Sequence, residues 1–270
     1  MNKLVKKFYK KAKKVSIKNE YKNIVVLSDL HLGNGGPTDN SLHNNLFLFT
    51  ALDYYYVNNY LVILNGDIFD IAECNLEDIK KCHEDIMWQF ERLHEEGRLI
   101  YIRGNHDDAI KEKDLETRPF SYTKERAAFL PGIKVYDYAE VTKASKCYRI
   151  LHGHQNNPKY VYFNGLMNFL IFNVWARLEK VCAKEQTGEL GSFTDNSKMI
   201  TDFSSDDFIT VVGHSHTVIL NQKNYFNDGC GVFPRCITAI EIEDTRTIAV
   251  KWAYYVGECG LVSVQRTVLS

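Results

Sequence analysis

Residues 23–31 read NIVVLSDLH, and this stretch predicts how the fold begins. The first part, Asn23–Ser28, is mostly apolar and β-branched, which favours a short buried strand. The run then ends in the polar sequence Ser28-Asp29-Leu30-His31. A buried strand that finishes in Asp and His predicts that polar side chains gather at the carboxyl end of a sheet.

The same arrangement recurs four more times along the chain. Short apolar runs occupy residues 61–64, 99–102, 148–151 and 209–212. They lead into Gly66-Asp67-Ile68-Phe69-Asp70, Gly104-Asn105-His106-Asp107, His152-Gly153-His154 and Gly213-His214-Ser215-His216. Because ligand sites of open α/β sheets lie beyond the carboxyl ends of strands, the five motifs are expected to converge on one rim.

Helical patterns separate the first three runs, at residues 44–58 and 77–96. Strands that alternate with helices predict an α/β domain whose first sheet is mainly parallel. Further along, Cys236–Glu243 and Thr247–Tyr255 alternate in polarity on either side of Asp244-Thr245. This pattern predicts an antiparallel hairpin.

Each motif alone has an ordinary structural explanation. Asp after a strand is often a helix N-cap, Gly-Asp pairs are often turns, and a single His is usually a surface or core residue. The number of motifs argues for a shared site, because six of the nine histidines lie within them. These six are His31, His106, His152, His154, His214 and His216.

The residue types of the motifs are those of a metal centre without thiolates. Asp offers hard oxygen, His offers imidazole nitrogen and Asn offers a neutral oxygen, and no motif contains Cys. Residues two apart on an extended strand point to the same side. Asp29 with His31, and His214 with His216, are therefore each expected to hold one ion. The two oxygens of Asp67 suit a carboxylate that bridges two ions.

The ordered set SDLH, GDIFD, GNHD, HGH and GHSH resembles the calcineurin-like metallophosphoesterase family over residues 24–243. The resemblance implies a four-layer αββα fold, in which a two-sheet β-sandwich is flanked by helices. It implies that Asp29, His31 and His216 bind a first metal ion, that Asn105, His152 and His214 bind a second, and that Asp67 bridges the two. It also implies orienting roles for Asp70 and Asp107, and a place for His154 near the first metal or the substrate.

The reaction that the resemblance implies is hydrolysis of a phosphodiester or pyrophosphate bond. A hydroxide held between two divalent ions would attack in line, and His106 would protonate the leaving oxygen or stabilise its charge. Mn²⁺ is the favoured metal, and Fe, Zn, Ni and Co suit the same ligands. The alternatives are a phosphomonoesterase or protein phosphatase, a nuclease, and a non-catalytic scaffold.

Part of the chain is similar to the UDP-2,3-diacylglucosamine pyrophosphatase branch of the family. The similarity lies in SDLHL, in GDIFD and in a helical insertion at residues 155–200. It implies a cap over an acyl-chain groove, a nucleotide-lipid substrate, and phosphate contacts from Arg177 and Lys180. The chain has His106 and HGH where that branch has Arg and HGD. By periodicity, the apolar segment 160–176 is equally a lid, a groove or a plain core helix.

Charge divides the chain unevenly. Residues 1–24 hold nine lysines and one acid, so the rest holds 24 basic and 33 acidic side chains and carries about −9. An acidic body disfavours nucleic-acid binding. Apolar side chains recur at helical spacing between the lysines of residues 2–18, which predicts an amphipathic helix. This helix suits a weak contact of residues 1–18 with an anionic membrane surface or a solvated arm. The plain alternatives are a helix packed on the body and a frayed tail.

Seven scattered cysteines without a CxxC pair predict reduced thiols in a cytoplasmic protein, peripheral at the membrane if the basic segment binds one. No apolar run follows the basic start, so no signal peptide is expected. Segment 160–176 is not expected to span a membrane, because motifs on both sides of it must meet. The predicted divisions are a basic helical extension (1–22), the metallophosphoesterase domain (23–258, with 155–200 as cap) and a tail (259–270).

Overall fold

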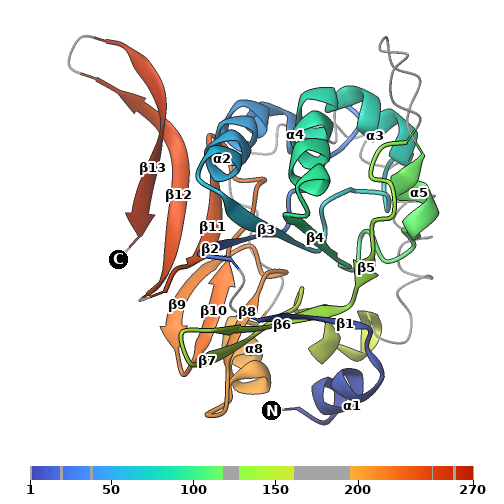
Figure 1. The fold of residues 1–270 in the computed structure, drawn as a ribbon, viewed down its shortest axis with the longest axis vertical. Helices are drawn as coiled ribbons and strands as arrows, with labels where there is room; N and C mark the ends of the chain where they lie inside the picture. Colours follow the sequence, from blue (N-terminus) through green and yellow to red (C-terminus); the bar gives the residue numbers. More distant parts are fainter. Residues whose placement is uncertain are drawn as a thin grey trace.

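The computed structural model describes residues 2–18, 21–36, 39–117, 128–160, 195–244, 246–257 and 260–269. Two mixed β-sheets lie face to face, and helices cover the outer face of each (Figure 1). This four-layer arrangement confirms the predicted fold class, a two-sheet sandwich flanked by helices.

The larger sheet has seven strands in the order β13-β12-β11-β2-β3-β4-β5. Four of its strands run parallel: β2 (Asn23–Leu27), β3 (Tyr60–Asn65), β4 (Leu99–Ile102) and β5 (Val135–Tyr136). The other three are β11 (Cys236–Ile242), β12 (Thr247–Val256) and β13 (Val262–Leu269). β11 pairs antiparallel with β2, and β11 and β12 form the expected antiparallel hairpin.

The smaller sheet has six strands in the order β1-β6-β7-β8-β10-β9. Their bounds are β1 (Lys14–Lys18), β6 (Tyr138–Lys143), β7 (Lys146–Ile150), β8 (Ile209–Val212), β9 (Val218–Gln222) and β10 (Tyr225–Asp228). β7, β8 and β10 run parallel to one another, so the carboxyl ends of β7 and β8 lie at the same edge.

Three buried clusters correspond to the three spaces between the layers. Helices α2 (Asn45–Val57), α3 (Leu76–Cys82), α4 (Glu84–Glu95) and α5 (Glu112–Glu116) lie on the side of the larger sheet. Helices α1 (Lys3–Lys11) and α8 (Asn196–Phe203) lie beneath the smaller sheet (Figure 1). Short 3₁₀ turns, η1 (Leu42–Asn44) and η2 (His154–Asn156), follow the first and fourth motifs.

Strand β2 shows why the opening apolar run has no polar face. Ile24 and Val26 point into the cluster between the two sheets, whereas Val25 and Leu27 point into the cluster beneath the helices. Since successive side chains of a strand alternate faces, a strand covered on both faces must be apolar throughout.

The prediction of one helix over residues 2–18, as a helical extension over 1–22, is wrong in its second half. Helix α1 ends at Lys11, and Lys14–Lys18 form the edge strand β1, which pairs in parallel with β6. Val15 and Ile17 alternate with polar residues, and Ile17 is buried between the sheets. Pairing with a neighbouring strand outweighs local helix propensity, which is only a weak tendency.

The helix expected at residues 77–96 is two helices, α3 and α4, that break at His83 (φ −115°, ψ 40°). The His83 ring is buried, with Nδ1 2.8 Å from Asn45 Oδ1 and Nε2 3.4 Å from Asp39 Oδ2. Contact with two polar partners therefore turns this residue out of the helix and toward the loop after the first motif.

The expected tail at residues 259–270 is also wrong, because Val262–Leu269 form strand β13 against β12. The Arg266 guanidinium pairs with the buried carboxylate of Glu241 on β11, with Nε 2.8 Å from Oε1. This ion pair and the ladder to β12 attach the final strand to the larger sheet.

Several predictions fall on residues outside the described ranges. The larger part of the predicted cap at 155–200, residues 161–176 of the apolar segment, and both Arg177 and Lys180 lie within residues 161–194. Among the helices that the structure describes, none is long and apolar enough to cross a membrane. The described cysteines, Cys74, Cys82, Cys147, Cys230 and Cys236, are free thiols.

Candidate metal centre

All five motifs begin where a strand ends. β2, β3 and β4 of the larger sheet lead into SDLH, GDIFD and GNHD, and β7 and β8 of the smaller sheet lead into HGH and GHSH. The candidate site therefore lies where the carboxyl ends of strands from both sheets meet. This convergence brings together residues that are up to 187 positions apart.

The motif backbone is not extended, contrary to the expected geometry of the Asp-x-His pairs. Asp29 (φ 50°), His31 (φ 44°), Asp67 (φ 52°), His214 (φ 66°) and His216 (φ 53°) all lie in the left-handed region. Non-glycine residues in this region cost roughly 1–3 kcal/mol each and concentrate at functional sites. The backbone N–H groups of Asp29 and His31 donate to Gly66 and Asp67 carbonyls, both at 3.0 Å, which holds the two loops together.

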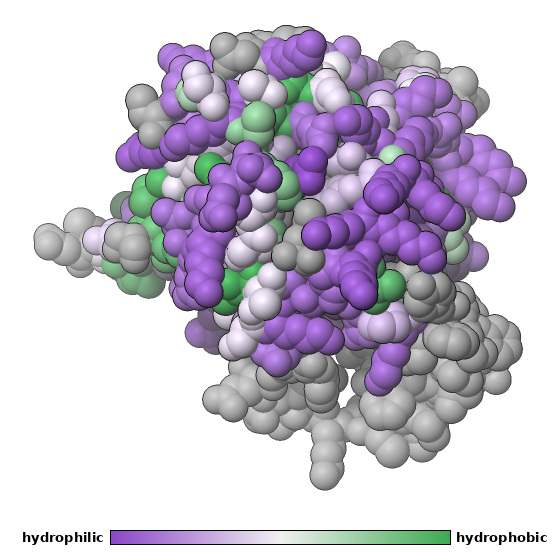
Figure 2. Space-filling model, turned by 90° about the horizontal axis from the view of Figure 1, so that it is seen from below, coloured by the Kyte–Doolittle hydropathy of each residue, from purple (hydrophilic) through white to green (hydrophobic). Residues whose placement is uncertain are grey.

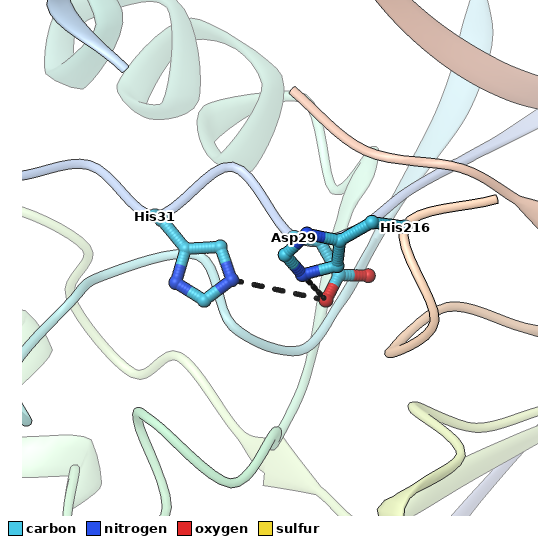
Figure 3. A group of neighbouring side chains, drawn as sticks. All are labelled: Asp29, His31 and His216. Atoms are coloured by element: carbon cyan, nitrogen blue, oxygen red, sulfur yellow. Dashed lines mark ion pairs between the residues drawn. The ribbon is translucent and has the colours of Figure 1, made fainter. Parts of the chain in front are cut away.

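The first group of side chains is Asp29, His31 and His216, whose potential ligand atoms all lie within 4.8 Å of one another. Both imidazoles point at one oxygen of Asp29 (Figure 3), with Nε2 of His216 at 3.2 Å and Nε2 of His31 at 3.9 Å from Oδ1. The other oxygen of Asp29 accepts the backbone N–H of His214 at 2.8 Å. Hydrogen bonding thus leaves Oδ1 directed at the two rings.

The second group is Asp67, His152 and His214. His152 Nε2 lies 3.1 Å from Asp67 Oδ2, and the same oxygen lies 3.9 Å from His31 Nε2 in the first group. Asp67 therefore stands between the groups. His214 and His216 fall in different groups, so the expectation that they hold one ion together is wrong.

Backbone contacts set the direction of two of these residues. His152 Nδ1 lies 2.9 Å from the carbonyl oxygen of Asn65, which fixes this nitrogen as the donor and leaves Nε2 facing Asp67. Asp67 Oδ1 accepts the backbone N–H of His106 at 2.8 Å. Asn105, the preceding residue in the same motif, is buried. A ring held through its second nitrogen is the usual arrangement of a metal-binding histidine.

The ionisable side chains of the centre shift one another's pKa values. Burial alone would lower the pKa of His152, but the Asp67 and Asp29 carboxylates outweigh it and raise this pKa to about 10. Burial likewise opposes ionisation of Asp29, yet the His152 and His216 imidazoles hold its pKa well below the usual value. Burial and the neighbouring His152 lower the pKa of His214 to about 3.

Three buried atoms of these two groups form no hydrogen bond with the described residues: Asp29 Oδ1, His31 Nε2 and His152 Nε2. Buried polar atoms are nearly always paired, so such a convergence calls for a missing partner. Oxygen and imidazole nitrogen donors directed at one space are suited to a divalent cation. The side chains present therefore fit the metal centre that the motifs predict.

Asp70 and Asp107, both predicted to orient ligands, have different contacts. Asp70 Oδ1 lies 2.9 Å from His106 Nδ1, and its Oδ2 lies 3.6 Å from His31 Nδ1, so it contacts two histidines. Asp107 contacts no histidine at hydrogen-bond distance. It accepts the backbone N–H groups of Gly104 (2.6 Å) and Ile68 (2.9 Å) and the Tyr101 hydroxyl (2.7 Å), and so ties the second and third motif loops together.

His154 lies beside the second group. Its ring centroid lies 5.5 Å from that of His152 and 6.3 Å from that of His214. The Tyr160 ring, which the sequence did not single out, packs edge-on against His214 at 5.1 Å.

A sixth strand end completes the centre and was missed in the sequence. Asp228 is the last residue of β10, and its Oδ1 accepts the hydroxyl of Ser28 at 2.6 Å; the same hydroxyl contacts Asp29 Oδ2. The Asn227 amide donates to the Gly213 carbonyl (2.8 Å) and the Ser215 hydroxyl (2.9 Å). The available signal was Asn227-Asp228-Gly229 after an apolar run, a pattern without His that also occurs in ordinary turns.

A sandwich that gathers carboxylates and imidazoles from both sheets at one edge has the architecture of a metallophosphoesterase. The family model described as calcineurin-like phosphoesterase matches residues 22–233 of this chain. The chain belongs to this family.

The chain is similar to several solved structures at low sequence identity. Vacuolar Protein Sorting 29 from Cryptosporidium parvum is 13% identical, with 93% of this chain and 98% of that chain covered and a TM-score of 0.37. A dimetal phosphatase from Danio rerio is 11% identical, with 84% and 94% covered and a TM-score of 0.44. A predicted phosphoesterase from Streptococcus pneumoniae is 15% identical, with 91% and 98% covered and a TM-score of 0.35. No curated protein matches the chain.

Proposed function

We propose that this chain hydrolyses phosphoric ester or pyrophosphate bonds with the help of two divalent metal ions. The observation that carries the proposal is the pair of side-chain groups, Asp29–His31–His216 and Asp67–His152–His214, with Asp67 between them. Two neighbouring cation sites that share a carboxylate are the arrangement of enzymes that transfer phosphoryl groups to water.

In this proposal Asp29, His31 and His216 would hold the first ion, Asn105, His152 and His214 would hold the second, and Asp67 would be a ligand shared by the two. When bound, the ions supply Lewis acidity at the phosphoryl oxygens and lower the pKa of water in the site. Mn²⁺ is the favoured ion, with Fe, Zn, Ni and Co as alternatives for the same donors.

His106 is the proposed acid. Its backbone N–H is anchored on Asp67, and its Nδ1 is held by Asp70 at 2.9 Å, which leaves Nε2 for the substrate. The His106 side chain is 23% exposed, whereas that of His152 is fully buried. A histidine at the rim of the site can donate a proton to the leaving oxygen, or stabilise charge there, without being a ligand.

The proposed bond is a phosphodiester or pyrophosphate bond, and a nucleotide-lipid diphosphate is the leading substrate candidate. The similarity of SDLHL, GDIFD and the insertion to the UDP-2,3-diacylglucosamine pyrophosphatase branch supports it. Arg177 and Lys180 are the proposed phosphate contacts from the insertion. A phosphomonoesterase or protein phosphatase is the second candidate, because His106 follows the general family pattern.

A metal-supplemented substrate panel tests the proposal. The full chain is assayed with each of Mn²⁺, Fe²⁺, Zn²⁺, Ni²⁺ and Co²⁺ against an aryl phosphomonoester, an aryl phosphodiester, a UDP-linked diphosphate and single-stranded DNA, with Asp67→Asn protein as the blank. We expect turnover of the diester and the diphosphate. Preference for the monoester would contradict the proposed phosphodiester or pyrophosphate hydrolysis and favour a phosphomonoesterase. Absence of turnover with each of the five metals would instead support the non-catalytic alternative.

A further inference from the structure

A cavity of about 390 Å³ lies between helix α1 and the turn η2. The wall from α1 consists of Leu4, Lys7, Phe8, Lys11 and Ala12, which recur every three or four residues and so form one helix face. We refer to this space as the α1 cavity.

The α1 cavity borders the candidate metal centre on the side of the second group. His154 and Tyr160 line the cavity. The centroid of the His154 ring lies 5.5 Å from that of His152, and the centroid of the Tyr160 ring lies 5.1 Å from that of His214. Arg103, two residues before Asn105, lines it as well. A substrate whose scissile phosphate sits at the metal centre can therefore extend its remaining part into this space.

Helix α1 is fixed in place, so its lysines stand at defined positions. Val5 is fully buried in the cluster that contains Met199 and Phe203 of α8. The backbone N–H of Asn2 donates to the Asp202 carbonyl at 3.1 Å, and strand β1 ties the other end of the helix into the smaller sheet. Val5, one of the apolar side chains of this helix, is thus buried within the protein and is not available to a membrane.

Cationic groups outnumber carboxylates in the lining of the cavity. Lys7, Lys11 and Arg103 face Asp108 and Asp137 there, and Asp137 already accepts the backbone N–H of Lys13 at 2.6 Å. The Nε atom of Arg103 is buried and has no hydrogen-bond partner among the described residues. A guanidinium with an unused donor is well suited to a phosphate or carboxylate oxygen.

We propose that the α1 cavity binds a second anionic group of the substrate, held by Lys7, Lys11 and Arg103, next to an apolar portion that packs on Leu4 and Phe8. This inference rests on the proposed hydrolase function and specifies its substrate class. The substrate is an elongated, amphipathic phosphoester with a second negative group beyond the scissile phosphate. The basic N-terminal segment is therefore a part of the substrate site rather than a solvated arm.

The test compares two substrates in the full, Mn²⁺-loaded chain. One is bis(p-nitrophenyl) phosphate, which has a single negative charge. The other is an alkyl ester of a nucleoside diphosphate, which has two anionic phosphoryl groups and an apolar chain. The variants are Lys7→Ala/Lys11→Ala and Arg103→Lys. The control is Lys6→Ala/Lys10→Ala, which removes the same charge from the same helix at exposed positions outside the cavity lining.

We expect the ratio of kcat/KM for the long substrate to that for the short one to fall by about tenfold or more in Lys7→Ala/Lys11→Ala, chiefly through KM, since each charge-assisted hydrogen bond is strong. A smaller fall is expected in Arg103→Lys and none in the control. An unchanged ratio, or an equal fall in the control, would overturn the inference. If wild-type protein turned over neither substrate, the proposed function would fail instead.

Discussion

Asp67 connects the two ligand groups, because one of its carboxylate oxygens lies near His31 of the first group and His152 of the second. Asp67→Asn removes the charge that attracts the ions and replaces one oxygen by a donor that cannot bind them. We expect loss of both metals and of all hydrolysis. Metal content by elemental analysis and turnover of the aryl diester measure the two effects. Retention of two metals with full activity would contradict the assignment.

His106 gives a prediction that contrasts with that for Asp67. Its ring contacts Asp70, and in the proposed function it acts as the acid and not as a metal ligand. His106→Ala should reduce kcat by ~10²–10⁴-fold, the usual contribution of a general acid. Metal content should remain that of the wild type. His43→Ala, at an exposed histidine outside the motifs, is the matched control. Metal loss in His106→Ala would make His106 a ligand instead.

Asp228 lies behind the first group and is the residue that the sequence reasoning missed. The Ser28 hydroxyl donates to it at 2.6 Å and also contacts Asp29. We expect Ser28→Ala to weaken metal affinity by ~10–100-fold, as is typical when a partner of a metal ligand is lost. Titration of metal-free protein with Mn²⁺ measures this. Wild-type affinity in the variant would show that Ser28 does not orient Asp29.

At the level of elements, the loop after β4 tolerates no side chain at Gly104. A Cβ there would lie 2.1 Å from Asp67 Oδ1 and 2.2 Å from the Asp67 backbone nitrogen. Gly104→Ala must therefore displace the bridging carboxylate, and we expect it to lose activity and metal together. Gly257→Ala, whose added Cβ would be 3.7 Å from its nearest neighbour, is the control. Equal activity in both variants would contradict the close approach of these loops.

The elements also show what the sequence could and could not predict. Strands β2 and β3 were predictable because both of their faces are buried, so composition alone marks them. The break at His83 and the strand β1 were not predictable, because each depends on partners distant in sequence, Asp39 and Asn45 for the first and β6 for the second. The left-handed backbone of Asp29 and His31 has no local sequence signal, since the surrounding hydrogen bonds impose it.

At the scale of the whole molecule, the proposed ions connect the two sheets of the sandwich. Asp29, His31, Asp67 and Asn105 follow strands of the larger sheet, whereas His152, His214 and His216 follow strands of the smaller one. Each ion would thus join side chains from both halves of the fold. The carboxylates and imidazoles that would hold the ions are buried close to one another. Three of their atoms, Asp29 Oδ1, His31 Nε2 and His152 Nε2, have no hydrogen bond from the described residues.

Metal loading should therefore stabilise the entire fold and not only the site. A ligand that binds only the native state stabilises it by about 2.7 kcal/mol at a concentration of 100 times Kd. We expect the melting temperature of the metal-free chain to rise with Mn²⁺ concentration, as measured by circular dichroism in the far and near ultraviolet. Asp67→Asn, which lacks the shared ligand, should show no such rise. A wild-type melting temperature independent of Mn²⁺, in protein shown to contain the metal, would mean that the ions do not link the sheets.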